Sequence, residues 1–105
     1  MRTELDETIG YVNKNMPLTS GIARSLIPVL FAGKGYVKRS EIIKVLSQYH
    51  IARGGKDTRP STQEIIVRYA LRDLEKACVV ERNPDVKGMF LLTYPIVSSN
   101  SVLIF

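Results

Sequence analysis

The chain has 105 residues, enough for one domain with one modest hydrophobic core. An apolar share of 45%, with ordinary numbers of glycines and prolines, argues against a disordered chain. The formal net charge is +5, and the excess lies in residues 34–94, which hold twelve basic and seven acidic residues. Residues 1–17 hold two basic and three acidic residues. Basic charge concentrated in this way favours a polyanionic partner, although a well-solvated basic surface would carry the same charge.

Cys78 is the only cysteine, which excludes an intrachain disulfide and a Cys-rich metal site. The opening "MRTELDETIG" is acidic and lacks the apolar segment of a signal peptide. No apolar run approaches the roughly 18 residues needed to cross a bilayer. We therefore expect a cytoplasmic protein (nucleoid-associated, or nuclear in a eukaryote) with no membrane partner.

The first two predicted helices lie at residues 3–16 and 20–32. The first has acids in its first turn and ends at Pro17, and the second is capped by Thr19 or Ser20 and ends at Gly33. Pro28 predicts either a bend in the second helix or a late start. The apolar stripes are, in order, Leu5, Ile9, Val12 and Met16, then Ile22, Leu26, Val29 and Leu30.

The third and fourth predicted helices lie at residues 40–53 and 61–77. The third has Ser40 as N-cap and ends at two glycines, and the fourth follows Pro60 with a capping box of Ser61 and Glu64. The apolar stripe of the third consists of Ile42, Ile43, Leu46, Tyr49 and His50. That of the fourth consists of Ile66 or Val67, Ala70, Leu71, Leu74 and Ala77.

A β-hairpin is predicted after the fourth helix. "VVER" and "MFLLTY" have strand character, and the turn between them is supplied by Asn83, Pro84, Asp85 and Gly88. The closing "IVSSNSVLIF" predicts a further strand or a tail docked on a partner. The fold class predicted is α+β, mainly helical with a small hairpin.

Residues 69–93, "YALRDLEKACVVERNPDVKGMFLLT", resemble the recognition helix and wing of winged helix-turn-helix DNA-binding proteins. The resemblance covers residues 20–94 and implies a three-helix core plus a wing, here with an extra N-terminal helix. The domain would span 18–94, with residues 1–17 and 95–105 as candidate dimer contacts. The residues that carry the likeness are Leu71, Leu74, Glu75 and Lys76, followed by Cys78, Val79, Val80, Glu81 and Arg82.

Two features depart from that family. Cys78 stands where the family usually has a glycine, in a turn that favours positive φ, so the turn is either built differently or strained. The connection "GGKDTRP" between the third and fourth helices is also longer than usual for the family.

The resemblance implies double-stranded DNA as partner, bound by a recognition helix at about 61–77 and a wing at about 79–94. We expect a homodimeric transcriptional regulator. The alternatives are a winged-helix module that binds proteins and an accessory DNA-binding protein of replication or partition. The candidate DNA contacts are Lys38, Arg39, Arg53, Lys56, Arg59, Thr62, Gln63, Arg68, Tyr69, Arg72 and Lys87.

Several of these residues have a second interpretation. Tyr69 can pack at the rim of the core, and Lys38 and Arg39 can be ordinary surface charges. Arg68 and Arg72 suit guanine and Gln63 suits adenine, but the two arginines can also be a like-charged pair that needs an anion opposite it.

The stretch "ARGGKDTRPST" contains a glycine-lysine pair but does not fit a nucleotide-binding loop. The Walker pattern needs a glycine where the chain has His50 and a serine or threonine where it has Asp57. The bases of this loop, Arg53, Lys56 and Arg59, are either phosphate contacts beside the recognition helix or charges on a solvated, mobile loop.

Catalytic motifs do not occur in the sequence. The single histidine and the single cysteine lie in different predicted elements, and neither HExxH nor Cys/His ligand spacing occurs. His50 is predicted at the rim of the core. We expect neither an enzyme nor a nucleotide, metal or other cofactor.

Overall fold

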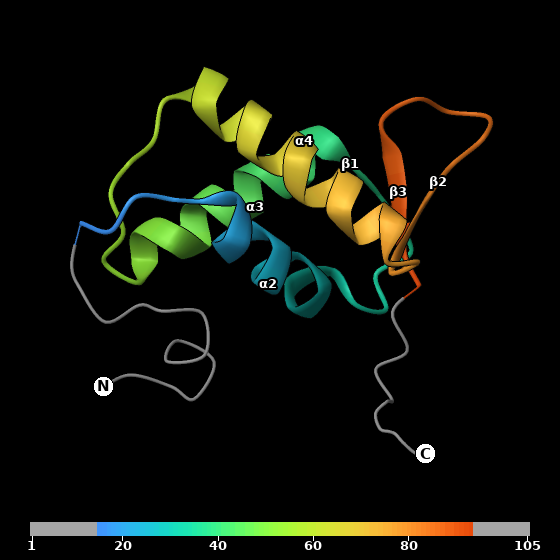
Figure 1. Cartoon of the computed structure of the whole chain (residues 1–105), viewed down its shortest axis with the longest axis horizontal. Coiled ribbons are helices and arrows are strands. Elements are labelled where there is room, and N and C mark those ends of the chain that lie inside the picture. The colour runs from blue at the N-terminus through green and yellow to red at the C-terminus, as the bar shows by residue number, and fades with distance from the viewer. Residues whose placement is uncertain (1–14, 94–105) are drawn as a thin grey trace, which may run out of the picture.

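The computed structural model describes residues 15–93 and contains three helices and a three-stranded antiparallel sheet in that range (Figure 1). The elements are α2 (Ser20–Phe31), β1 (Tyr36–Lys38), α3 (Arg39–Ala52), α4 (Pro60–Lys76), β2 (Val80–Arg82) and β3 (Met89–Leu92). The α+β prediction is confirmed at this level. The predicted N-terminal helix and the tail 95–105 lie outside the described residues, except for residues 15–17, which are not helical.

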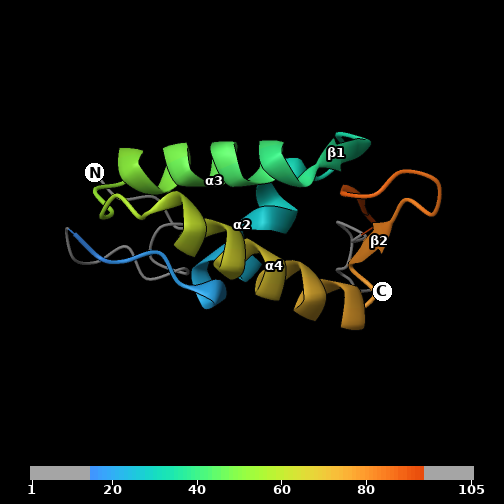
Figure 2. The same ribbon diagram turned by 90° about the horizontal axis from the view of Figure 1, so that it is seen from above.

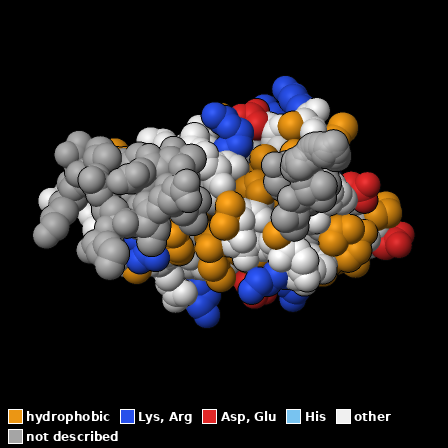
Figure 3. Space-filling model, turned by 90° about the horizontal axis from the view of Figure 1, so that it is seen from below, with side chains coloured by type: hydrophobic (Ala, Val, Ile, Leu, Met, Phe, Trp, Pro, Cys, Tyr) orange, Lys and Arg blue, Asp and Glu red, His pale blue; other side chains and the backbone are white. Residues whose placement is uncertain are grey.

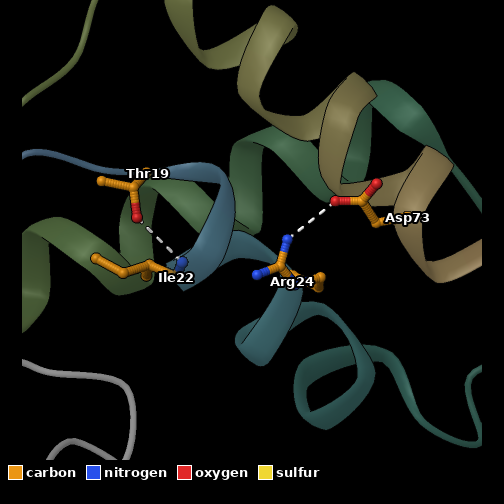
Figure 4. A network of polar contacts seen from close by, with 4 residues as sticks. All are labelled: Thr19, Ile22, Arg24 and Asp73. Atoms are coloured by element: carbon orange, nitrogen blue, oxygen red, sulfur yellow. Dashed lines mark hydrogen bonds and ion pairs between the residues drawn. The ribbon is translucent and has the colours of Figure 1, made fainter.

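Thr19 caps α2, as predicted. Its hydroxyl accepts a hydrogen bond from the Ile22 N–H at 3.1 Å (Figure 4), which satisfies one of the free donors of the first turn. The helix starts at Ser20 and continues through Pro28, so a late start is wrong. Val29 was predicted to be buried but is 55% exposed, because it lies at the edge of a stripe centred on Leu26 and its buried neighbours.

Strand β1 was not predicted, because only Val37 of its three residues faces the core. It pairs with β3 and continues directly into α3, where the Arg39 N–H donates to the Gly88 carbonyl at 2.8 Å. The Ser40 cap is therefore wrong: strand pairing fixes where α3 begins, and Lys38 is the N-cap residue without a side-chain hydrogen bond.

The predicted capping box of α4 is also wrong. Pro60 is the first helical residue, a position that needs no N–H donor, and this places Ser61 inside the helix. Ala77 follows the last helical residue and is exposed, whereas the rest of the predicted stripe is at least half-buried. The buried residues of α4 are Gln63, Val67, Ala70, Leu71 and Leu74.

The sheet has the strand order β1-β3-β2, so β3 lies in the middle. Its Phe90 pairs with Val37 on one side and with Arg82 on the other, and its side chain is 2% exposed. One core lies between this sheet and the three helices. Its most buried large members are Leu26, Ile27, Ile42, Leu46 and Val67.

Cys78 occupies the turn between α4 and β2 with a φ of 62°. The Cys78 N–H donates to the Glu75 carbonyl at 3.0 Å and the Val79 N–H to the Leu74 carbonyl at 2.9 Å. These two bonds define the helix end that places a left-handed residue, usually glycine, after the C-cap. The positive φ expected at this turn is confirmed, with a cysteine in the strained conformation.

The turn chemistry of the hairpin is also confirmed. The Asn83 Oδ1 accepts a hydrogen bond from the Asp85 N–H at 2.8 Å, and Gly88 has a φ of 78°.

Candidate nucleic-acid interface

The first turns of α4 and the loop between β2 and β3 project from the same side of the molecule. In Figure 1 both stand at the top, with α2 below them. Figure 2, seen from that side, shows α4 beside α3 and running towards β2. The outward face of α4 exposes four of the candidate contacts, which are Thr62, Arg68, Tyr69 and Arg72.

The opposite side has a different surface. Figure 3 shows apolar side chains across its middle, with Lys and Arg mainly towards the margins. Helix α2 lies on this side (Figure 1).

Gln63, expected to contact bases, belongs to the interior. It is 8% exposed, and its amide Nε2 donates to the Ser47 Oγ and to the Thr58 carbonyl, both at 2.8 Å. These bonds tie α4 to α3 and to the loop before α4. The prediction that Gln63 faces a nucleic acid is therefore wrong, because the side chain is on the buried side of α4 and its donors are already bonded.

Arg68 and Arg72 each contact a side chain of their own helix. A nitrogen of the Arg68 guanidinium lies 3.5 Å from the Glu64 Oε2, and the Arg72 guanidinium lies 5.4 Å from the centre of the Tyr69 ring. Glu64 thus supplies the anion that the sequence suggested for Arg68. Tyr69 is 50% exposed on the outward face of α4.

Two further arginines beside α4 form ion pairs that were not predicted. Arg24 of α2 lies 2.9 Å from the Asp73 Oδ2 (Figure 4), and Arg82 of β2 lies 2.9 Å from the Glu75 Oε1. Forty-nine residues separate Arg24 from Asp73, so no local pattern marks that pair. Both pairs join α4 to a neighbouring element.

A groove of about 400 Å³ lies between the start of α3, α4 and the hairpin loop. Lys38, Arg39 and Lys87 line it, together with Glu64 and Val86. A second hollow of about 210 Å³ is lined by Arg39, Arg82 and Lys87 among others. The fold thus brings the adjacent pair Lys38 and Arg39 together with Lys87, a candidate contact far from them in sequence. The partial positive charge at the start of α3 adds to the positive charge of these side chains, and the negative charge of Glu64 reduces the total.

The basic loop 53–59 leads into the first turn of α4, and its backbone is hydrogen-bonded to residues 15–16. The Asn15 N–H donates to the Gly54 carbonyl at 2.7 Å, and the Lys56 N–H donates to the Met16 carbonyl at 2.9 Å. Arg53 stacks over the Tyr49 ring at 4.7 Å, while Lys56 and Arg59 are exposed. Hydrogen bonds thus hold the backbone of the loop against residues 15–16, and both of its interpretations, phosphate contact or solvated charge, stay predictions.

His50 anchors the same loop and is buried, with 1% of its surface exposed, so the predicted rim position is wrong. Its Nε2 lies 2.9 Å from the Met16 carbonyl oxygen, and because that oxygen only accepts, we assign the ring proton to Nε2. Burial lowers the pKa of His50, against a smaller opposing effect of the Met16 and Lys56 backbone groups. The buried ring and its contact with the Met16 carbonyl thus hold residue 16 against the end of α3.

No protein-family model, curated protein or solved structure matches this chain. Within residues 15–93, no helix is both long and apolar enough to span a membrane. In the same range, no three His, Cys, Asp or Glu side chains gather as a metal-binding group.

Proposed function

We propose that the chain is a winged helix-turn-helix protein that binds double-stranded DNA. The observation that carries the proposal is the gathering of basic side chains from three elements on one side of the molecule. Lys38 at the end of β1, Arg39 at the start of α3 and Lys87 of the hairpin loop line one groove. Glu64 of α4 lines the same groove and lies 3.5 Å from Arg68, and Arg72 is exposed on the same helix. The order of the three helices and the hairpin formed by β2 and β3 after them also agrees with the sequence resemblance, and a further strand, β1, lies between α2 and α3.

In this proposal α4 enters the major groove and the hairpin loop serves as the wing. Base edges are contacted by Thr62, Arg68 and Arg72, whereas the lysines and arginines of the groove bind phosphates. Phosphate contacts fix the protein on the duplex, and contacts to base edges select the sequence. Lys56 and Arg59 extend the phosphate-binding surface at the first turn of α4.

Salt dependence tests the proposal. Each phosphate neutralised by a lysine or arginine releases condensed counterions, so log Kobs is expected to fall linearly with log salt concentration. Fluorescence anisotropy of a labelled duplex, titrated with the full chain at several salt concentrations, measures the slope. Salt-insensitive binding, or no binding to any duplex, would contradict the proposal.

Charge reversal tests the surface. The double variant Arg68→Glu and Arg72→Glu is expected to weaken binding to every duplex at least about a hundredfold, because two attractive charges become repulsive. Lys34→Glu in the turn after α2, combined with Lys44→Glu at an exposed position of α3, is a control that changes the net charge equally. Equal losses in the two double variants would show that net charge, and not this face of α4, governs the affinity.

We further propose a homodimeric transcriptional regulator. Two-fold symmetry would present two α4 helices to half-sites about 34 Å apart, one helical turn of DNA. The candidate dimer contacts, which include Leu5, Ile9 and Val12, lie outside the described residues. Sedimentation equilibrium of the free chain and the stoichiometry of its DNA complex test this, and one chain per duplex would contradict it.

A second candidate function is a winged-helix module that binds a protein. The observation in its favour is an apolar pair on the outward face of α4, Ile65 at 47% and Tyr69 at 50% exposure. Such a module would bind its partner through this pair and show no affinity for DNA. If a partner is captured and binding survives reversal of Arg68 and Arg72 while no duplex binds, this candidate replaces the first.

A further inference from the structure

We infer that α4 selects guanine, through Arg68 and Arg72, and that Glu64 and Tyr69 are positioning residues for the two guanidinium groups. The inference rests on the proposed DNA-binding function and specifies what that surface recognises. It begins from the side chains that α4 exposes.

Gln63, the residue of α4 that was expected to contact adenine, is not on the surface of the protein. A glutamine amide suits the N6 and N7 edge of adenine, but the Gln63 amide is buried and bonded to Ser47 and Thr58. Among the charged donors that α4 exposes, Lys76 lies in its last turn, and Arg68 and Arg72 lie nearer its middle. The two arginines are guanidinium groups, whose fork matches the O6 and N7 acceptors of guanine.

The arginines beside α4 fall into two groups. Arg24 and Arg82 have ion pairs of 2.9 Å that bind α4 to other elements. The 3.5 Å separation between Arg68 and Glu64 is longer than a charge-assisted hydrogen bond, and both side chains are about half exposed. Arg68 can therefore exchange this weak contact for a base edge without breaking the fold.

Arg72 is held differently. Its guanidinium lies over the exposed Tyr69 ring, a contact that restricts the side chain without occupying its N–H donors. Arginine held in this way loses less conformational freedom on binding, which favours a geometrically demanding bidentate contact. Tyr69 thereby acts on recognition through Arg72.

The spacing of the two arginines limits the DNA site. Four residues advance about 6 Å along a helix, and successive base pairs are about 3.4 Å apart. With α4 aligned along the major groove, the two guanidinium groups reach base edges within about two base-pair steps. We expect a half-site with two G·C pairs that are adjacent or separated by one pair.

The test is selection of short duplexes with a randomised centre by the full chain, followed by affinities for the selected site and for versions with each guanine replaced. We expect each replacement to weaken binding about tenfold or more. Arg68→Lys and Arg72→Lys keep the charge and lose the fork, so each should abolish the preference at one guanine while binding to unrelated duplexes changes little. Glu64→Gln should strengthen binding to all duplexes and reduce the preference for guanine.

Lys87→Ala is the matched control, since a phosphate contact should weaken binding to all duplexes alike. Circular dichroism and thermal melting establish that each variant is folded. Salt-dependent binding without guanine enrichment, or enrichment that the Arg-to-Lys variants retain, would overturn the inference and leave DNA binding intact. Failure to bind any duplex would overturn both.

Discussion

At the scale of single residues, Cys78 holds a strained backbone conformation. Its φ of 62° places a side chain with a Cβ in the left-handed region, which costs about 1–2 kcal/mol for an L-residue. Both backbone bonds of the helix end, to Glu75 and to Leu74, depend on that conformation. The thiol is free and exposed, so its packing does not offset the strain.

Cys78→Gly is therefore expected to stabilise the protein. Glycine removes the strain but adds freedom to the unfolded chain, so a net gain of about 0.5–1 kcal/mol should remain. Urea unfolding followed by circular dichroism measures it. Cys78→Ala keeps the Cβ and should leave the free energy of unfolding nearly unchanged, which separates backbone strain from loss of the thiol. A glycine variant no more stable than the alanine variant would contradict the argument.

At the scale of elements, the connection between α3 and α4 contains two glycines with different functions. Gly54, at a φ of 90°, ends α3, and its N–H donates to the Ile51 carbonyl at 2.9 Å. Gly55 lies against the His50 ring, which a Cβ at that position would overlap. Within this long connection, Gly54 and Lys56 form backbone hydrogen bonds with residues 15–16, and Gly55 packs against the imidazole of His50.

Gly55→Ala is expected to destabilise the protein by about 1–3 kcal/mol, because the added methyl group displaces a buried ring. Gly21→Ala is the matched control. It lies inside α2, where a Cβ would be an ordinary 3.8 Å from the Thr19 Oγ1, and alanine should stabilise the helix by about 0.5–1 kcal/mol. Thermal melting of both variants checks the opposite signs. An unchanged melting temperature for the Gly55 variant would show that the ring moves at no cost.

At the scale of the whole molecule, His50 makes stability depend on pH. Above the unfolded pKa of about 6.5 the ring is neutral in both the folded and the unfolded state, so its protonation does not reduce the free energy of unfolding. Because the folded pKa of His50 is lowered, the unfolded chain binds the proton first as pH falls below that value. Stability should then decrease by at most about 1.4 kcal/mol per pH unit until the folded pKa is passed.

The chain has a single histidine, so its ring resonances in NMR give the folded pKa directly. We expect a midpoint below that of a histidine-containing peptide. Urea unfolding between about pH 7.5 and pH 5.5 should show less pH dependence for His50→Gln than for the natural chain. Equal slopes, or a midpoint at the peptide value, would contradict the burial argument.

Much of the helical fold could be predicted from the sequence. The apolar stripe of α4 and the turn residues of the hairpin are patterns of residues close together in the sequence, so they can be recognised without knowledge of the tertiary structure. Strand β1 has only Val37 facing inward, too little for an alternation to be recognised. The starts of α3 and α4 were misplaced because strand pairing and Pro60 set them rather than side-chain caps.

Less of the candidate site than of the fold could be predicted from the sequence. The exposed arginines of α4 follow from helical periodicity, but the burial of Gln63 depends on Ser47 and Thr58, which approach it only in the folded chain. The pairing of Arg24 with Asp73 likewise depends on how α2 packs against α4. Contacts between distant segments are set by tertiary packing, which a single sequence does not display.

The hydrogen bond from the Arg39 N–H to the Gly88 carbonyl has a spectroscopic consequence. It joins the first residue of α3 to the end of the hairpin loop, so the Arg39 amide proton is protected from solvent only while that loop stays in place. Amide hydrogen exchange at this one position would therefore measure the opening of the loop. A duplex that engages the loop should slow the exchange of Arg39, whereas a ligand bound elsewhere should leave it unchanged.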